Sequence, residues 1–547
     1  HGLTFGPDPS THASCTMAGM IGNNACGVHS LMAGRTSDNV EAMDVLTYDG
    51  TRLTVGQTDD QAWEAKAGEG GRVGEIYREL RRLRDDAADL IRDRYPDIPR
   101  RVSGYNLDDL LAEKGGNIAR ALSGSEGTCV LHLDTTVRLV TSPPARTLLV
   151  LGYADVAAAA DDVPAILAHQ PIGLEGTAAS LIDNMRAKGI EADGVKLLPE
   201  GRGWLLVEFG ADDTADATAQ AMKLLEELSR RSNPPSSKLI DDRTVARKVW
   251  SAREAAVGAG ARLADGRDTW SGWEDAAVPP DKLGDYLRDF RALTDRFDYF
   301  STVYGHFGQG CVHTRLDFDL RDADGIAKYR RFVEEAADLV VRYGGSLSGE
   351  HGDGHSRAEL LERMFGRELI DAFARFKRIW DPACRMNPGR IVDPEPLDAQ
   401  LRLGAGYTLP QLDTHFTYPD DEGGFGRAVA RCIGVGKCRR EEGGTMCPSY
   451  MVTREEQHTT RGRARLLYEM AEGRMSGGWR NEQVKEALDL CLACKGCSHD
   501  CPASVDVATY KAEFFSHYYE HRRRPLQAYA FGWIHRWARL AAITPGL

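Results

Sequence analysis

Four cysteines near the C-terminal end of the sequence have a spacing suited to holding iron. They lie in the run Cys491-Leu-Ala-Cys494-Lys-Gly-Cys497-Ser-His-Asp-Cys501-Pro. In the pattern C-x2-C-x2-C-x3-C-P, three thiolates of one loop bind one iron-sulfur cube, and the fourth cysteine serves a second cluster. Structural zinc sites prefer two separated C-x2-C pairs. We therefore predict an iron-sulfur cluster rather than zinc.

A second group of cysteines, upstream, is incomplete. The two-cluster pattern requires a cysteine at position 435, where this chain has Val435. Each triple of cysteines takes its fourth ligand from the other motif. One complete 4Fe-4S set then consists of Cys447, Cys491, Cys494 and Cys497. A set of only three is left, namely Cys432, Cys438 and Cys501. It is enough for a three-iron cluster, a labile cluster or none, and we favour a single complete cluster.

Two glycine-flanked motifs contain candidate ligands for a different metal. His306 and His313 lie in Gly-His-Phe-Gly-Gln-Gly-Cys-Val-His, and Glu350 and His351 lie in Ser-Gly-Glu-His-Gly-Asp. Two histidines and one glutamate with an open position suit catalytic zinc or a similar divalent ion. His351 could then remove a proton from a metal-bound hydroxyl. The alternative is that these histidines only make hydrogen bonds in glycine-rich turns.

Two arginines could bind a substrate carboxylate. Arg315 follows the second histidine, and Arg253 lies in Trp-Ser-Ala-Arg-Glu. The planar guanidinium suits bidentate binding of a carboxylate. The ordinary alternative is a solvated arginine.

Two glycine-rich segments, residues 18–27 and 123–128, are candidates for phosphate binding. The first has neither helical nor strand periodicity, and the second leads into a strand. Glycines let the backbone approach a ligand, and successive N–H groups can hold a phosphate. The sequence has no Rossmann or P-loop fingerprint. Turns without a ligand are the alternative.

The predicted elements place these motifs in an α+β chain. Residues 146–240 alternate as β-α-β-β-α-β, the ferredoxin-like order. Earlier in the chain we expect a hairpin after the strand at 41–48, a helix over 74–94 and a strand over 129–140. Further helices are expected over 245–261, 280–296, 327–343 and 358–380.

Length, charge and cysteine distribution narrow the class of protein. The 547 residues suggest about three or four domains. A net charge of -13 argues against non-specific nucleic-acid binding, which needs a basic surface. No apolar run is long enough to predict a membrane span. Seven of the 12 cysteines lie between Cys432 and Cys501, which is typical of a metal centre in a reducing compartment such as the cytoplasm.

The motifs divide the chain into five parts. We expect a domain that contains both glycine-rich segments at 1–145, a domain that contains the histidine motifs at 146–395, a linker at 396–424, a mainly α-helical iron-sulfur domain at 425–515, and a tail at 516–547. The aromatic, basic tail either docks on a following domain, which we favour, or lies on a membrane surface.

Several motifs together resemble the FAD-linked oxidase family, with a flavin domain of the vanillyl-alcohol-oxidase type. They are Gly6-Pro-Asp-Pro-Ser10, residues 18–27, Gly124-Ser-Glu-Gly-Thr128, Gly305-His306, Gly349-Glu-His-Gly352 and Asn387-Pro-Gly389. The resemblance spans residues 1 to about 395. With the ferredoxin-type module, the whole is similar to the bacterial D-2-hydroxyglutarate dehydrogenase branch of iron-sulfur flavoproteins.

The resemblance implies noncovalent FAD. Residues 1–145 would be only the C-terminal part of the FAD-binding domain, and residues 146–395 would be the substrate and metal domain. The implied FAD contacts are Gly22, Asn23, Asn24, Gly27, Gly124, Ser125, Glu126, Gly127, Thr128 and Asn387. It also implies a D-2-hydroxy acid held at a metal, with zinc the best candidate, by His306, His313 and Glu350. His351 would be the base and the flavin would accept hydride, while Arg315 and Arg253 bind carboxylate.

Two departures from the family pattern concern the substrate. Gln309 and Cys311 stand where the family usually has Asp and Asn, and a Lys near Trp273 is replaced. D-lactate or glycolate is therefore an alternative to D-2-hydroxyglutarate, and a non-catalytic electron-transfer subunit is an alternative of another class. We expect electrons to pass to an acceptor protein or quinone from a homo-oligomer that is cytoplasmic or peripheral at the inner face of the membrane.

Overall fold

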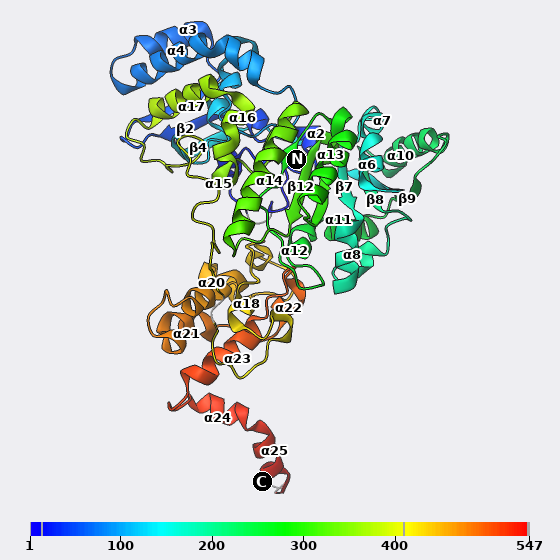
Figure 1. The fold of residues 1–547 in the computed structure, drawn as a ribbon, viewed down its shortest axis with the longest axis vertical. Coiled ribbons are helices and arrows are strands. Elements are labelled where there is room, and N and C mark those ends of the chain that lie inside the picture. The colour runs from blue at the N-terminus through cyan, green and yellow to red at the C-terminus, as the bar shows by residue number, and fades with distance from the viewer. Residues whose placement is uncertain (1, 13–14, 409–410, 544–547) are drawn as a thin grey trace. The chain divides into compact units, whose positions relative to one another are not determined.

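The computed structural model describes residues 2–12, 15–408 and 411–543, in two units that divide after Tyr407 (Figure 1). Residues 409–410 of the predicted linker, residues 544–547 of the predicted tail, and residues 1 and 13–14 of the predicted flavin domain lie outside the described part. Helices and strands mix in the first unit, and the described part of the second is helical. The predicted α+β class is confirmed.

The N-terminal part of the first unit is built on a three-stranded sheet. Its central strand β2 (Val40–Leu46) pairs antiparallel with β3 (Arg52–Gly56) and β4 (Leu131–Val137), so the predicted hairpin is confirmed. The predicted helix is α4 (Gly71–Arg94), which packs with α3 (Asp60–Gly68). Other short elements here are β1 (Leu3–Thr4), β5 (Val140–Thr141), α2 (Ser30–Ala33) and α5 (Ile118–Leu122).

The first glycine-rich segment is helical, which contradicts the predicted absence of regular structure. Helix α1 (Met17–Asn23) begins at Thr16, whose side chain accepts the Gly19 N–H at 3.1 Å. Asn24, directly after its last residue, caps it with a left-handed φ of 50°. Only Met20 and Ile21 of α1 are buried, so the hydrophobic pattern is too short to reveal the helix.

A seven-stranded antiparallel sheet forms the centre of the first unit, in the order β10-β12-β11-β7-β8-β6-β9. Its strands are β6 (Ala145–Tyr153), β7 (Gly173–Ala178), β8 (Gly203–Ala211), β9 (Ser236–Ile240), β10 (Ala276–Ala277), β11 (Ser301–Gly305) and β12 (Cys311–Leu316). The first four strands along the chain lie as β9-β6-β8-β7, which confirms the ferredoxin-like arrangement.

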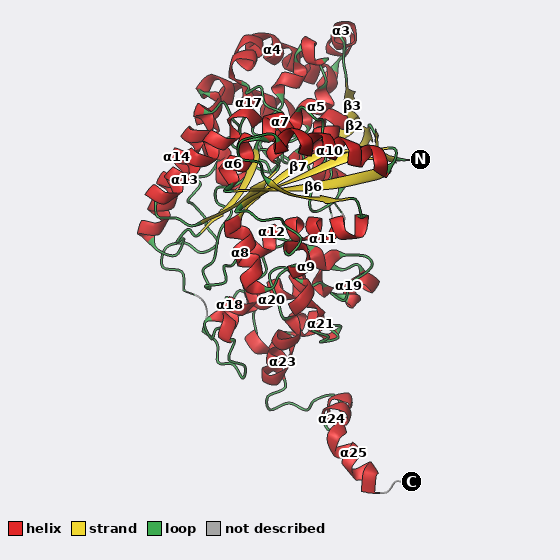
Figure 2. Ribbon diagram, turned by 90° about the vertical axis from the view of Figure 1, so that its right-hand side faces the viewer, coloured by secondary structure: helices red, strands yellow, loops and turns green. Residues whose placement is uncertain are grey.

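Helices cover both faces of this sheet (Figure 2). One face packs on α6 (Val156–Asp161), α7 (Val163–Leu167), α10 (Thr214–Ser229) and α13 (Leu283–Arg296). The other packs on α8 (Ala179–Lys188), α9 (Ala192–Val195), α11 (Arg243–Glu254) and α12 (Ala256–Gly260). Alternation along β6 explains the two cores, because Leu149 and Leu151 join one cluster while Leu148 and Val150 join the other. Helix α8 was not predicted.

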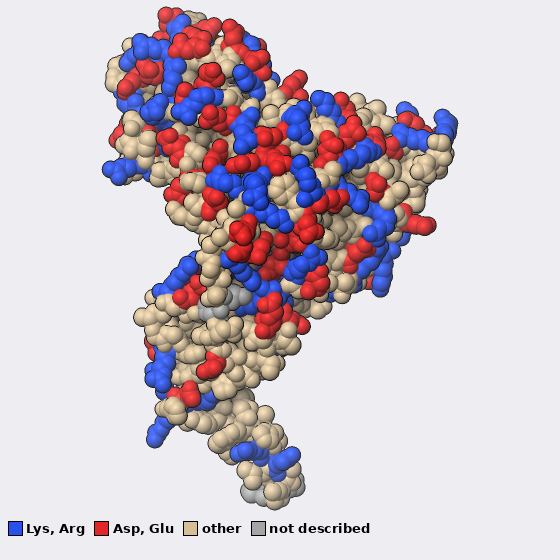
Figure 3. Space-filling view, viewed as in Figure 1, with Lys and Arg blue, Asp and Glu red and all other residues tan. Residues whose placement is uncertain are grey.

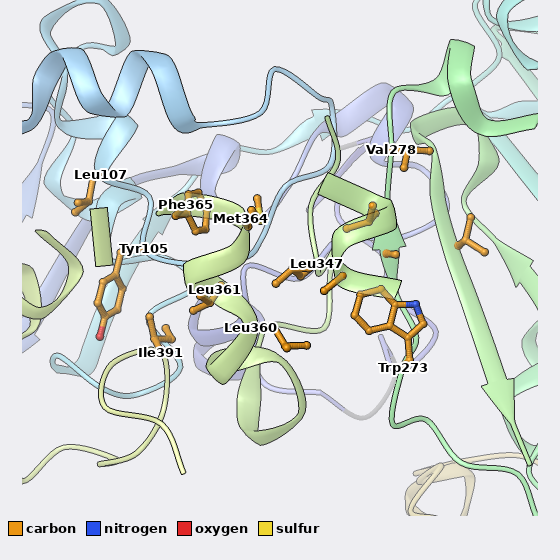
Figure 4. Close-up of a cluster of buried hydrophobic side chains, with 14 of the residues drawn as sticks. Tyr105, Leu107, Trp273, Val278, Leu347, Leu360, Leu361, Met364, Phe365 and Ile391 are labelled. Carbon is orange, nitrogen blue, oxygen red and sulfur yellow. The ribbon is translucent and has the colours of Figure 1, made fainter. Parts of the chain in front are cut away.

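Buried apolar side chains fix both ends of the segments that contain the candidate ligands (Figure 4). Trp273 and Val278 lie on either side of an acidic pair, and Leu347 and Leu360 bracket the loop that contains Glu350. The helices of this region are α14 (Ala323–Arg342), α15 (Gly354–Arg357), α16 (Leu361–Phe365) and α17 (Arg367–Trp380). Glu350 and the acidic pair therefore sit on short segments with rigid ends.

The second unit has its own hydrophobic core. Its helices are α18 (Phe425–Val429), α19 (Pro448–Thr453), α20 (Thr460–Ala471), α21 (Glu482–Asp489), α22 (Gly496–Asp500), α23 (Val507–Tyr518), α24 (Leu526–Gly532) and α25 (Ile534–Ile543). Among the described residues, α24 and α25 bury no side chain, and no helix is long and apolar enough to cross a membrane.

Acidic and basic side chains are intermixed over the face of the first unit that is visible in Figure 3.

Gly310 is a position where the fold leaves no space for a side chain. It lies between β11 and β12 with φ of 70°, and an added Cβ would be 1.8 Å from the Val278 carbonyl oxygen. We expect Gly310→Ala to lower the free energy of unfolding by about 3 kcal/mol or more. The Val278 carbonyl must move away from the new Cβ, and the alanine must also keep an unfavourable positive φ. Thermal denaturation measures this.

Gly344→Ala is the matched control. Gly344 has a similar φ of 72° but no atom within 4 Å of an added Cβ. It should lose only about 1 kcal/mol, the cost of a left-handed alanine. Equal losses in the two variants would contradict the steric argument.

Candidate functional site

Three imidazoles converge on one carboxylate oxygen. Oε1 of Glu350 lies 3.0 Å from Nε2 of His306, 3.1 Å from Nε2 of His313 and 3.3 Å from Nε2 of His351. The rings of His313 and His351 stack with centroids 4.8 Å apart. The structure therefore brings together all four side chains that the two sequence motifs singled out. We call these four residues the histidine cluster.

Two further carboxylates hold the opposite side of each ring. Nδ1 of His306 is 2.6 Å from Glu175 Oε1. Glu274 serves two rings, with Oε1 2.6 Å from Nδ1 of His351 and Oε2 3.3 Å from Nδ1 of His313. A carboxylate on Nδ1 fixes both the tautomer and the orientation of an imidazole that binds metal through Nε2.

The sheet explains how these groups meet. His313 on β12 pairs with Tyr304 on β11, so both side chains point to the face covered by α11 and α12. Glu175 on β7 points to the same face, because Leu174 beside it packs in the other core. His306 follows the end of β11 directly. The one-turn 3-10 helix of residues 307–309 and Gly310 complete the hairpin that returns the chain to His313.

Asp275 fixes the loop that contains the other two members of the cluster. This side chain is fully buried, and it accepts hydrogen bonds from Ser348 Oγ at 2.5 Å, Glu350 N at 3.1 Å and His351 N at 2.8 Å. Asp275 has φ of 73°. This left-handed residue breaks strand alternation, so that neighbouring Glu274 and Asp275 both face the cluster.

Arg100 links the histidine cluster to the flavin-domain part of the chain. Its buried guanidinium donates to Glu350 Oε2 at 3.3 Å, to Gln309 Oε1 at 2.9 Å and to the Gly27 carbonyl at 2.6 Å. The Gln309 amide in turn donates to the Ser30 carbonyl at 3.2 Å. Gln309, which departs from the family pattern, is thus part of this contact.

Burial and ion pairing oppose each other in the cluster. Burial disfavours the charged form of each group, but the surrounding charges dominate. Although burial lowers it, the carboxylates of Glu274 and Asp275 hold the pKa of His351 well above its ordinary value. Burial would raise the pKa of Glu350, but the three histidines hold it well below its usual range. Without a cation, a His351 imidazolium stands beside the carboxylate of Glu350.

The donor set fits a divalent ion. His313, His351, Glu350 and Asp275 each offer a ring nitrogen or a carboxylate oxygen, and these four atoms lie within 4.8 Å of one another. His306 contacts Oε1 of Glu350. Histidine nitrogen and carboxylate oxygen are ligands that zinc prefers. An ion in this position would replace the contacts that Glu350 now makes with protons of the histidines.

A cavity of about 510 Å³ opens beside the cluster, and all four cluster residues line it. Arg253 also lines it, stacks 4.8 Å above the Tyr304 ring and donates to Glu175 Oε2 at 2.6 Å. Arg315 is not among the lining residues. Its guanidinium donates instead to the Thr269 carbonyl at 2.8 Å. The carboxylate-binding roles of both arginines remain predictions.

The two glycine-rich segments lie side by side. Gly124 N donates to the Ile21 carbonyl and Glu126 N to the Gly22 carbonyl, each at 2.8 Å. The buried Asn24 Nδ2 and Ser125 Oγ have no hydrogen-bond partner within the described structure, as expected for groups that await a ligand. The segments therefore fit a bound cofactor.

The remaining predicted flavin contacts lie within these segments, except Asn387, which bonds to one of them. Asn23 ends α1, and Gly27 accepts the bond from Arg100. Thr128 Oγ1 donates to the Ser125 carbonyl at 2.6 Å, and Asn387 Nδ2 donates to the Glu126 carbonyl at 2.7 Å. Gly127 has φ of 69° with open space around it. Glu126 accepts the Asp353 N–H at 2.6 Å, which ties this loop to the loop of Glu350.

In the second unit, helix N-termini point at the cysteine thiols. Thr460 N, at the start of α20, donates to Cys447 Sγ at 2.9 Å. A hydrogen bond from Cys447 lowers the pKa of Cys438 to about 6 against burial, with help from the Arg461 N–H. The N–H groups of Val507 and Ala508, at the start of α23, donate to Cys497. Such N–H groups stabilise the negative charge of an iron-sulfur centre.

The three cysteines of the incomplete predicted set lie close to one another. Cys432 is close enough to Cys501 and Cys438 for their thiolates to raise its pKa to about 11, with burial the larger cause. The buried Arg463 faces the thiols of both predicted sets, and Lys511 donates to the Cys491 carbonyl at 2.6 Å. Buried thiols with N–H donors and nearby cations fit an anionic cluster. Cys494 is exposed.

Sequence reasoning missed the residues that support the ligands. Glu175, Glu274, Asp275 and Arg100 occur singly among ordinary strand and loop residues. Only the acidic pair after Trp273 offered a signal, since two adjacent carboxylates within an apolar stretch are costly unless they have partners. In the second unit, the run Thr459-Thr-Arg-Gly-Arg463 could have been identified as a helix start rich in donors.

Comparison with known proteins identifies three domains. Residues 142–391 match the family described as FAD linked oxidases, C-terminal domain. Residues 1–56 match a FAD binding domain, and residues 428–505 match a 4Fe-4S dicluster domain. The predicted resemblance is confirmed, as are FAD-binding and iron-sulfur domains.

The curated D-2-hydroxyglutarate dehydrogenases extend beyond the part that this chain matches. The chain is 31% identical over 589 residues to D-2-hydroxyglutarate dehydrogenase of Pseudomonas putida, and 28% identical over 593 residues to that of Escherichia coli. Each match covers 100% of this chain but 58% of the relative. Glycolate oxidase subunit GlcD of Bacillus subtilis is 26% identical, over 71% of each chain.

Glu274→Gln should weaken metal binding more than Glu175→Gln does. Glu274 holds two imidazoles and Glu175 holds one. Losing a carboxylate behind a ligand histidine typically costs 10- to 100-fold in metal affinity, as an order of magnitude. Competition with a chelator measures the affinity. Equal affinities in wild type and Glu274→Gln would contradict this assignment.

Cys447→Ser should damage the main iron-sulfur cluster more than Cys432→Ser. Cys447 belongs to the complete predicted set, and Cys432 belongs to the set that Val435 leaves short. Iron content and the electron paramagnetic resonance signal of the reduced protein measure the loss. Equal losses in both variants would argue against a single complete cluster, and Val435→Cys should add iron if only that ligand is lacking.

Proposed function

The chain contains the C-terminal domain of FAD linked oxidases and a 4Fe-4S dicluster domain, and on this premise we propose that it oxidises a D-2-hydroxy acid to the 2-oxo acid. D-2-hydroxyglutarate is the favoured substrate, because relatives with that name match along the whole chain. The chain spans 58% of the length of those relatives, so the rest of a longer protein could contribute to the activity.

The observation that supports this proposal most is the convergence of three Nε2 atoms on Glu350 Oε1 in the wall of a cavity. Each ring is restrained from behind by Glu175 or Glu274. Such a site can hold a divalent ion, with zinc our candidate, which would supply Lewis acidity toward the hydroxyl and carboxylate of a 2-hydroxy acid. Histidines with a purely structural role would not need these carboxylates bonded to their Nδ1 atoms.

His351 is the candidate general base. Its side chain is 44% exposed toward solvent, whereas His313 beside it is 4% exposed, so His351 is the ring that a substrate can reach. A divalent ion bound at Glu350 would favour loss of the His351 proton, and Glu274, which holds Nδ1, would then leave Nε2 free to take the hydroxyl proton. The carboxylate would then stabilise the imidazolium. His306, His313 and Glu350 would keep the substrate oxygen in position, and Arg253 is a candidate to bind its carboxylate.

Bound FAD would accept the hydride from the substrate carbon and release electrons one at a time. The cysteine-rich unit would receive them, with its thiols stabilised by α20 and α23. The final acceptor would be a partner protein or a quinone. We propose that the protein acts in the cytoplasm or at the inner face of the membrane, as a homo-oligomer.

Glycolate or D-lactate is the second candidate substrate. The similarity to a glycolate oxidase subunit over 71% of the chain favours it, as does Gln309 in place of the family's usual Asp. An electron-transfer subunit without catalysis is less favoured, because such a subunit would not need the histidine cluster.

Anaerobic addition of D-2-hydroxyglutarate to the full-length holoenzyme should bleach the flavin absorption. D-lactate and glycolate, compared by kcat/KM, rank the alternatives. If no 2-hydroxy acid bleaches the flavin, the proposed dehydrogenase activity is wrong.

His351→Ala should lower kcat by about 100-fold or more, as expected for loss of a general base. His355→Ala is the matched control, because His355 lies in the same loop but its Nε2 contacts the Ala399 carbonyl at 3.0 Å. Both variants should keep their iron-sulfur signal. Full turnover in His351→Ala would favour the electron-transfer subunit.

A further inference from the structure

Helix α11 presents one face to the cavity beside the histidine cluster. The lining residues of α11 recur at helical spacing, and they are Arg243, Ala246, Arg247, Trp250, Arg253 and Glu254. The inner end of this face, at Arg253, contacts Tyr304 and Glu175 beside the cluster. The other end therefore lines the part of the cavity that lies farther from the candidate metal ligands.

The arginines that line the cavity differ in what they bind. Arg146 donates to Glu208 Oε2 at 3.1 Å, and His29 contacts the same oxygen at 2.7 Å. Arg253 is paired with Glu175. The side chains of Arg243 and Arg247, by contrast, form no ion pair or hydrogen bond within residues 2–12, 15–408 and 411–543. Two guanidinium groups that line the cavity thus have no carboxylate partner.

Helix geometry selects Arg247 of these two. It precedes Arg253 by six residues, which places its Cα about 9 Å further along the axis, whereas Arg243 lies about 15 Å away. The carbon chain of a five-carbon diacid spans about 5 Å when extended. With its hydroxyl at the histidine cluster, the far carboxylate of such an acid lies within reach of the long Arg247 side chain. Arg243 is too distant for the same contact.

We propose that Arg247 binds the second carboxylate of a dicarboxylic 2-hydroxy acid and thereby selects it over monocarboxylic acids. This inference rests on the proposed function, since the cluster must bind the 2-hydroxy end. A guanidinium binds a carboxylate through two charge-assisted hydrogen bonds. Arg243, at the outer rim, adds only long-range attraction that salt screens.

Calorimetric binding of glutarate and pentanoate to the full-length holoenzyme tests this. The two acids have equal carbon number and differ in the second carboxylate. The wild type should bind glutarate at least about tenfold more tightly, because hydrogen bonds to charged groups carry this much affinity. Arg247→Gln should lose most of this preference while its affinity for pentanoate is unchanged.

Lys248→Gln is the matched control, because it removes a positive charge from the neighbouring position of α11. Lys248 does not line the cavity and pairs with Asp193 at 3.8 Å. It should keep the preference for glutarate. Three results would overturn the assignment: no preference in the wild type, equal loss of both acids in Arg247→Gln, or the same loss in Lys248→Gln. Neither acid has a hydroxyl to oxidise, so failure here is distinct from failure of the flavin-bleaching test.

Discussion

The structure of the candidate site depends on one buried carboxylate oxygen, Glu350 Oε1, which three imidazoles approach at 3.0 to 3.3 Å. Bringing these rings together would be unfavourable if their charges were not balanced, because burial penalises every ionised group. Glu175 and Glu274 supply the balancing charge behind the rings. The sheet and the Asp275-anchored loop place these groups with the accuracy that a metal ligand set needs.

Short contiguous motifs could be predicted from sequence because their residues stay together in the fold. His306 and His313 flank one hairpin, and Glu350 and His351 are neighbours, so spacing alone brought each pair near a common point. The ferredoxin-like order was likewise predictable, since its four strands and the helices that follow β6 and β8 have a clear periodicity, although α8 was missed. These signals are local in the sequence, so they can be identified without knowledge of the tertiary structure.

The supporting residues could not be predicted in this way. Glu175 looks like one polar residue in a strand, and its role follows only from the pairing of β7 with β11. Arg100 is distant in sequence from every residue that it contacts. Helix α1 was missed for another reason, because small residues conceal its period. The contacts of Glu175 and Arg100 are distant in sequence, and α1 has too few apolar side chains to show a helical period.

The three-way contact of Arg100 constrains how this chain can change. Its guanidinium joins the Gly27 carbonyl, Gln309 and Glu350, which belong to three separate segments. Substituting Arg100 would leave a buried carboxylate and a buried amide without their donor, so a single change at one position is costly while compensated changes are not. In related chains, residues 100 and 309 should therefore vary as a pair.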